Sequence, residues 1–289
     1  MSNIEDRDLS FSLISSTARK LWKNSKPPKG SEFTFRSKII CDSDDETIEQ
    51  VMLQVEDDNR IHDPIQDLVK RKYFAVGKLI ESELLTDQNI YLYDNLKSKA
   101  SKQAVLDMIK EAGFRGIVIS KTNYDKTKEM MNEAIKRHSI IYFDERTAIG
   151  ELKTNPDFIK DVRLVAEFDD EVRWKCFADV IHNQTKHATI IDVKSYSNYK
   201  SVSVKAKLIR SGYVHQLCFM SIIMSKVLNK KINNDGYILA VDTDNGTIKS
   251  WRFELDGYME QTKEIALKIS RVMMSMRSRR KKSTKFKAK

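Results

Sequence analysis

The chain has 289 residues, 40% of them hydrophobic and 32% charged, with a net charge of +10, a composition typical of a soluble globular protein. It contains no run near the roughly 18 apolar residues that a membrane-spanning helix needs, and its polar first residues lack the apolar segment of a secretion signal. Cys41, Cys176 and Cys218 are widely spaced and odd in number, which favours a reducing cytoplasm over a disulfide framework.

The first half of the sequence is patterned for helices. Between residues 64 and 86, apolar side chains recur every three or four positions, which is the period of an amphipathic helix. Shorter segments repeat this pattern, and two brief apolar and aromatic runs indicate strands. The predicted helices cover residues 14–25, 45–54, 64–86, 99–112 and 122–138, and the predicted strands cover 88–94 and 116–120.

The period changes after Pro156. Apolar and polar residues now alternate in twos over three segments, 162–168, 172–182 and 188–195, with turn-rich stretches between them. Side chains two residues apart lie on the same face of a strand. The pattern therefore predicts an antiparallel meander of three strands.

Helical periodicity returns after the meander. A helix of about thirty residues is expected from Tyr199 to Lys230, followed by a hairpin that turns at Asp244-Asn245-Gly246. A last helix is expected over residues 258–276. This order favours an α+β fold in which helices flank a mixed central sheet.

The predicted elements form a single domain over residues 1–276. A helical N-terminal lobe is expected over about 1–155, and the core with its strand meander over about 156–276.

Most of the positive charge lies at the end of the sequence. Eight basic residues and no acidic residue occur from Arg277 to Lys289, so subtracting them from the net charge of +10 leaves about +2 for the rest. We expect residues 277–289 to form a basic flexible tail that neutralises phosphate groups of a polyanion. The alternative is a solubilising terminus without a dedicated target.

Three charged residues lie on two neighbouring strands of the meander. Asp192 and Lys194 are two positions apart and share one face, and a short hairpin places Asp179 beside Asp192. Such charges are costly to bury unless they pair or hold a cation. Magnesium prefers carboxylate and carbonyl oxygens and keeps waters that can become nucleophiles, and the carbonyl of Val193 offers a further ligand. Lys194 would orient or deprotonate the attacking water, or stabilise developing charge.

The spacing of an acid and a lysine is not specific by itself. The same pattern occurs at Glu151-Leu152-Lys153, in a polar stretch with no strand before it. The pattern at Asp192 differs because apolar residues precede it and an aspartate occurs thirteen residues earlier on the paired strand. The remaining alternative for these residues is a surface ion pair beside a strand edge.

The segment WKCFADVIHNQTKHATIIDVKS, residues 174–195, resembles the RecB-like branch of the PD-(D/E)xK nucleases. Downstream, Gln216 begins a segment similar to that branch's Q-x-x-x-Y motif, with Met220 in place of the tyrosine. Upstream, Gly77 to Glu81 resembles the G-x-x-x-E helix motif in the form found in lambda exonuclease. The layout of residues 14–230 is similar to the exonuclease VIII proteins of phages and prophages.

The resemblance implies a restriction-endonuclease-like core and a set of site residues. Mg²⁺ would be the cofactor, with Mn²⁺ able to replace it. Glu167, on the first strand of the meander, competes with Glu81 for the role of third acid. The resemblance implies metal binding by Glu81, Asp179, Asp192 and the carbonyl of Val193, catalysis by these acids with Lys194, and a place beside the scissile strand for Gln216.

The resemblance also implies an activity and partners. It implies an exonuclease that acts in phage-type recombination and digests one strand of double-stranded DNA from an end, 5′ to 3′. The strand that remains would be bound by a single-strand annealing protein. It further implies a homo-oligomer in the cytoplasm of a bacterial host cell, encoded by a phage. Two alternatives remain: an endonuclease of the same superfamily, and a non-catalytic DNA-binding module with a degenerate nuclease fold.

Overall fold

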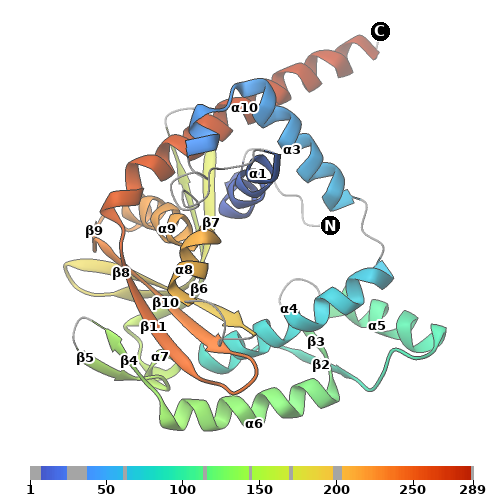
Figure 1. Cartoon of the computed structure of the whole chain (residues 1–289), viewed down its shortest axis with the longest axis vertical. Helices are drawn as coiled ribbons and strands as arrows, with labels where there is room; N and C mark the ends of the chain where they lie inside the picture. Colours follow the sequence, from blue (N-terminus) through green and yellow to red (C-terminus); the bar gives the residue numbers. More distant parts are fainter. Residues whose placement is uncertain are drawn as a thin grey trace.

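The chain forms an α+β fold with helices on both faces of a mixed central sheet, as the sequence predicted (Figure 1). Within the described part of the chain, no helix is long and apolar enough to cross a membrane. The computed structural model describes residues 8–24, 38–60, 64–112, 116–142, 145–168, 172–197 and 204–287.

Among the described residues, the central sheet has seven strands, in the order β1-β7-β8-β10-β11, with β6 also paired to β7 and β9 to β8. The meander of β6, β7 and β8 is antiparallel, which confirms the prediction, whereas β10 pairs with β8 in parallel. These strands are β1 (Asp8–Ser10), β6 (Phe158–Glu167), β7 (Arg173–Asn183), β8 (His187–Tyr196), β9 (Lys231–Ile232), β10 (Asp235–Asp242) and β11 (Ile248–Glu254).

One face of the sheet packs against helices from both ends of the chain. The main core cluster lies here, and its largest side chain, Trp174, is 1% exposed, stacks on Phe219 and donates a hydrogen bond to Ser270 Oγ at 3.2 Å. Burial of one such side chain stabilises a fold by roughly 1.5–3 kcal/mol. The helices that contribute to this cluster are α1 (Phe11–Asn24), α3 (Asp45–Arg60), α8 (Val204–Arg210), α9 (Tyr213–Leu228) and α10 (Asp256–Lys287).

The other face carries a second core cluster formed with α4 and α6 (Figure 1). Helix α4 packs Ile80 and Leu84 against Ile191 and Val193 of β8. Thus the first 155 residues contribute to both faces: α1 and α3 join the main cluster, and α4 and α6 join the second. The remaining elements are α4 (Pro64–Leu84), β2 (Ile90–Tyr93), α5 (Lys99–Ala112), β3 (Ile117–Ser120), α6 (Lys121–Arg137), β4 (Ser139–Tyr142), β5 (Glu145–Ala148) and α7 (Glu151–Thr154).

Two helix predictions need correction. The helix expected from Tyr199 to Lys230 is interrupted, because Gly212 adopts a left-handed φ of 77° between α8 and α9. Tyr199 itself lies outside the described residues. The last helix does not end at residue 276: α10 continues through the basic segment to Lys287, and its end extends beyond the other elements in Figure 1.

Other differences concern short elements. The β10–β11 hairpin forms where predicted, but its turn is longer than two residues, with the Asp242 carbonyl accepting from Gly246 N–H at 2.8 Å. Strands β1, β4 and β5 and helix α7 were not predicted, because segments of three or four residues carry too little periodicity.

Candidate active site

The candidate site lies where β7 and β8 separate. Their ladder runs from Asn183 paired with Ala188 to Val180 paired with Ile191 and then stops. The next rung would pair Asp179 with Asp192. Because β6 occupies the other edge of β7, β1 pairs along the edge that β8 has left. The two strands therefore form a fork, with an aspartate on each arm.

The side chain of Asp179 replaces a backbone acceptor at this fork. Its Oδ2 accepts a hydrogen bond of 2.7 Å from the Val193 N–H. The backbone of β7 makes no ladder bond to β8 beyond Val180, so the carboxylate satisfies an amide that would otherwise lack an acceptor on this side. This bond fixes one oxygen of Asp179 in the plane of the sheet.

Asp192 is the most buried charge of the site, with only 1% of its side chain exposed. Its Oδ2 lies 2.5 Å from Lys194 Nζ, and its Oδ1 accepts a hydrogen bond of 3.3 Å from Gln216 Nε2. The contact with Lys194 is a buried ion pair in which the ammonium partners this oxygen. A carboxylate has about four lone-pair sites, so Asp192 can bind a cation in addition to Lys194 and Gln216.

Helix α9 supplies the groups that hold Asp192 and Lys194 from the main-core face. Gln216 and Tyr213 are three residues apart and lie on the same side of this helix. Lys194 Nζ lies 5.0 Å from the centroid of the Tyr213 ring and donates to the Val193 carbonyl at 3.3 Å. Helix α9 begins directly after Gly212, so the left-handed turn at this glycine determines the position of Tyr213 and Gln216 relative to the fork.

Helix α4 brings Glu81 to the fork from the opposite face. A Cβ atom at Gly77 would lie only 2.8 Å from Oγ of Ser195, so the absence of a side chain allows α4 to approach β8 closely. Glu81 lies one turn further along the same helix, where its pKa responds to the charges of Asp179 and Lys194. Both faces of the sheet therefore contribute to one site.

The electrostatics follow from burial and like charges. Burial raises the pKa of Asp179, and the neighbouring Asp192 raises it further. Burial and the charge of Asp179 raise the pKa of Glu81 in the same way. Burial alone lowers the pKa of Lys194, but Asp192 and Asp179 outweigh it, so that this pKa lies above its ordinary value. The fork holds more negative charge than one lysine neutralises.

The donor set fits a magnesium ion. No group of three histidine, cysteine or acidic side chains stands at metal-binding spacing among the residues that the structure describes. Magnesium does not require such a group, because it is commonly held by one or two carboxylates together with waters and substrate phosphates. Asp179, Asp192 and the Val193 carbonyl are oxygen donors at neighbouring positions of the fork.

The rival acid and the second acid–lysine pattern lie elsewhere. Glu167 is exposed at the far end of β6, paired with Arg173, six residues along the strand from the rung of Asp179. Six residues of strand span about 20 Å, so Glu167 does not reach the fork. Lys153, on α7, lies outside the fork and pairs with Asp87 at 2.6 Å.

One residue near the fork was not predicted. Asp161 of β6 stands on the rung of Asp179, between the pairs Lys160–Val180 and Val162–Ala178. Its φ is 51°, a left-handed value, and its negative charge raises the pKa of Glu81. The sequence carries a weak signal, because aspartate is depleted in strands and tolerates left-handed backbone.

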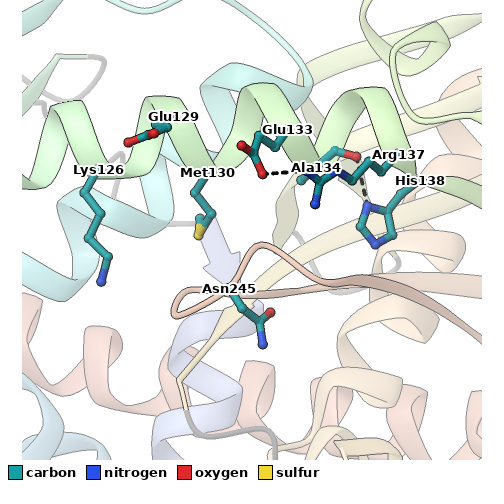
Figure 2. A pocket seen from close by; sticks show the side chains of 8 residues that line it. All are labelled: Lys126, Glu129, Met130, Glu133, Ala134, Arg137, His138 and Asn245. Carbon is teal, nitrogen blue, oxygen red and sulfur yellow. Dashed lines mark hydrogen bonds and ion pairs between the residues drawn. The ribbon is translucent and has the colours of Figure 1, made fainter.

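A cavity of about 260 Å³ lies away from the fork, between α6 and the β10–β11 hairpin (Figure 2). Its wall carries a mixture of opposite charges, including an exposed ion pair of 3.0 Å between Arg137 and Glu133. The hairpin approaches α6 closely at Gly246, where a Cβ atom would lie 2.8 Å from Cγ of Met130. This cavity is a packing groove beside a hairpin, and none of the predicted site residues lines it.

Comparison with known proteins adds similarities of overall shape. No protein-family model matches the chain, and no curated protein matches it. A crystal structure of a "putative exonuclease" from Eubacterium rectale is similar over 95% of this chain and 85% of its own, at 13% identity and a TM-score of 0.44. The crystal structure of SSO0001 is similar over 70% of this chain and 84% of its own, at 14% identity and a TM-score of 0.31. Both scores are low, so neither similarity by itself indicates a function.

Proposed function

We propose that this chain is a magnesium-dependent deoxyribonuclease that hydrolyses phosphodiester bonds of double-stranded DNA from an end. The observation that supports the proposal most is the fork, where Asp179, Asp192 and Lys194 meet with Gln216 from one face and Glu81 from the other. Acids with raised pKa values beside a specific charge partner are typical of catalytic sites.

The acids of the fork would hold the ion. Asp179 and Asp192, with the Val193 carbonyl and the nearby Glu81, are the groups of this chain suited to Mg²⁺ or Mn²⁺. Bound there, the ion would supply a water of lowered pKa and neutralise charge on a phosphate. Gln216 donates to Asp192 and so keeps the second oxygen of that carboxylate in a fixed orientation.

Lys194 would act on the water and the phosphate, whereas Glu81 would remain a ligand of the ion. Because Asp192 and Asp179 keep Lys194 protonated, its ammonium acts as a donor that orients a water and stabilises developing negative charge on the phosphate. It is poorly suited to remove a proton. Burial and the charge of Asp179 raise the pKa of Glu81, and a cation held in the fork would oppose this shift and favour the carboxylate.

The requirement for a DNA end comes from the resemblance to phage exonucleases and is tested directly. Linear duplex should be degraded in Mg²⁺ while covalently closed circles of the same sequence persist. Degradation should stop in EDTA and return when Mg²⁺ or Mn²⁺ is added. Label at the 5′ end should be released as small products before label at the 3′ end, if digestion runs 5′ to 3′.

The outcomes separate the alternatives. Rapid linearisation of circles would favour an endonuclease of the same superfamily. Binding of DNA without hydrolysis in either metal would favour a non-catalytic DNA-binding module. A homo-oligomer, measured by light scattering in solution, and capture of a single-strand annealing protein are further expectations of the proposal.

A further inference from the structure

Asp161 has an unusual backbone for its place in the sheet. It lies within β6 and adopts a φ of 51°, where residues with a Cβ atom are disfavoured. The other described non-glycine residue with a positive φ is Asn229, at the end of helix α9, where left-handed residues are common. Strain within a strand persists only when the surrounding structure requires it.

The strand changes face at this residue. Ile159 packs against the main core cluster, and so do Val162 and Leu164. In a regular strand, residues 159 and 162 would point to opposite faces, because they are three positions apart. The left-handed residue between them reverses the alternation.

Strand β7 changes face on the same rung. Ala178 and Ile181 both belong to the main core cluster although they are three positions apart, whereas Val180 belongs to the cluster on the other face. The register with β6 is the same on both sides of the change, and the ladder omits only the pair of Asp161 and Asp179. The two strands therefore switch together.

The switch decides where Asp179 points. Ala178 lies on the main-core face, so an uninterrupted strand would direct Asp179 to the opposite face. Asp192 follows Ile190 on the main-core face of β8. Only a strand that switches at residue 179 can place its carboxylate beside Asp192 while keeping Trp174 in the main core.

We propose that Asp161 is a positioning residue: its left-handed backbone holds the face switch of β6 and β7 that presents the Asp179 carboxylate to Val193 N–H and Asp192. The conformation of residue 161, not its charge, is the useful property. Its negative charge acts against ionisation of Glu81 and so does not assist that acid. The catalytic consequence rests on the proposed function, whereas the positioning of Asp179 does not.

A substitution series separates conformation from charge. Asp161→Gly and Asp161→Asn remove the carboxylate but tolerate a left-handed φ, whereas Asp161→Val strongly disfavours it. Glu167→Val is the matched control, because it also replaces an exposed acid of β6, away from the switch. Asp161→Ala provides a milder variant if the valine variant does not fold.

The first readout is amide hydrogen exchange in the valine-labelled full-length protein. We expect the Val193 amide to be as protected in the glycine and asparagine variants as in the parent. In the valine variant its exchange should be at least about tenfold faster. Val241, in the central strand β10, reports global opening in the same spectrum. Protection retained in the valine and alanine variants of Asp161, or lost equally in all four Asp161 variants, overturns the proposal.

The second readout is calorimetric titration with Mg²⁺ alone. The glycine and asparagine variants should bind like the parent, and the valine variant should bind at least about tenfold more weakly, as expected when a metal ligand is misdirected. Asp179→Asn tests the proposed function in parallel. If the parent and Asp179→Asn take up no Mg²⁺, the proposed metal site fails, while the exchange of the Val193 amide still decides the role of Asp161.

Discussion

The sequence contains an acid, an apolar residue and a lysine in succession at two places. One copy of this pattern lies on a buried strand and the other on an exposed short helix. Asp192 and Lys194 lie on a strand, 1% and 18% exposed, and form an ion pair of 2.5 Å. Glu151 and Lys153 lie on the short helix α7, where the lysine pairs instead with Asp87 and the glutamate accepts from the Ala148 N–H. The same residue types at the same spacing thus form a buried ion pair in one place and surface contacts in the other.

Periodicity explains this difference. Residues two apart share a face in a strand but lie about 200° apart around a helix. Burial then amplifies the difference, because charges in a low-dielectric site interact several times more strongly than exposed charges. An exposed ion pair such as Lys153–Asp87 is screened by water and contributes little to stability.

The largest expected effect on DNA turnover comes from substituting the buried charged residues of the fork. Lys194→Ala, Asp192→Asn and Asp179→Asn should each lower DNA turnover by at least roughly a hundredfold, because each removes charge from the metal site or the group that stabilises developing charge. Steady-state digestion of linear duplex measures this effect, and DNA binding in Ca²⁺ should be largely retained.

The matched control is the exposed acid–lysine pair of α7, Glu151 and Lys153. Lys153→Ala and Glu151→Gln should leave turnover within about twofold of the parent, as surface changes away from a site usually do. Circular dichroism should confirm folding of each variant. If folded Lys194→Ala cuts DNA at the parent rate, the fork is not the active site.

The next effect tests whether the buried residues act as one unit. The double change Asp192→Asn with Lys194→Ala should cost far less than the product of the two single losses, because either change already disables the site. A double-mutant cycle on turnover measures the difference. Multiplicative losses would mean that the two residues act independently.

A smaller contrast involves two glutamates on α4. Glu81 lies near enough to the fork for Asp179 to raise its pKa, whereas Glu83 bonds Lys128 of α6 at 2.7 Å. Glu81→Gln should lower turnover by about ten- to a hundredfold, the range seen when a supporting group of a metal site is lost. Glu83→Gln should lower the melting temperature while leaving turnover within about twofold. Equal losses of turnover would remove Glu81 from the site.

The smallest expected effect concerns the lysines at the basic end of the chain. Truncation after Arg280 removes five lysines and keeps Arg279, which pairs with Glu49 of α3. DNA binding should weaken and its dependence on salt should flatten, by about 0.9 in log–log slope for each phosphate that the protein no longer neutralises. Cleavage at low salt should survive. An unchanged slope would show that these lysines do not bind phosphate.

Much of this architecture follows from local pattern. The strand meander, the helices of the first half and the shared face of Asp192 and Lys194 were predicted, because alternation in twos and in threes and fours is a local property of the sequence. The break at Gly212 and the extension of α10 were not predicted. A glycine within a helical pattern is usually tolerated, and a basic segment has no apolar face to reveal its helix.

The sequence by itself predicted the candidate residues Asp179, Asp192 and Lys194 and the strands on which they lie. Only the tertiary structure decided that Glu81 and Gln216 meet at the fork from opposite faces, that Glu167 stays about 20 Å away along its strand, and that Asp161 stands on the rung of Asp179. Contacts between residues far apart in the chain depend on register and on which helix covers which face. A change of face at a single left-handed residue leaves almost no trace in local periodicity, because the pattern on either side of it is that of an ordinary strand.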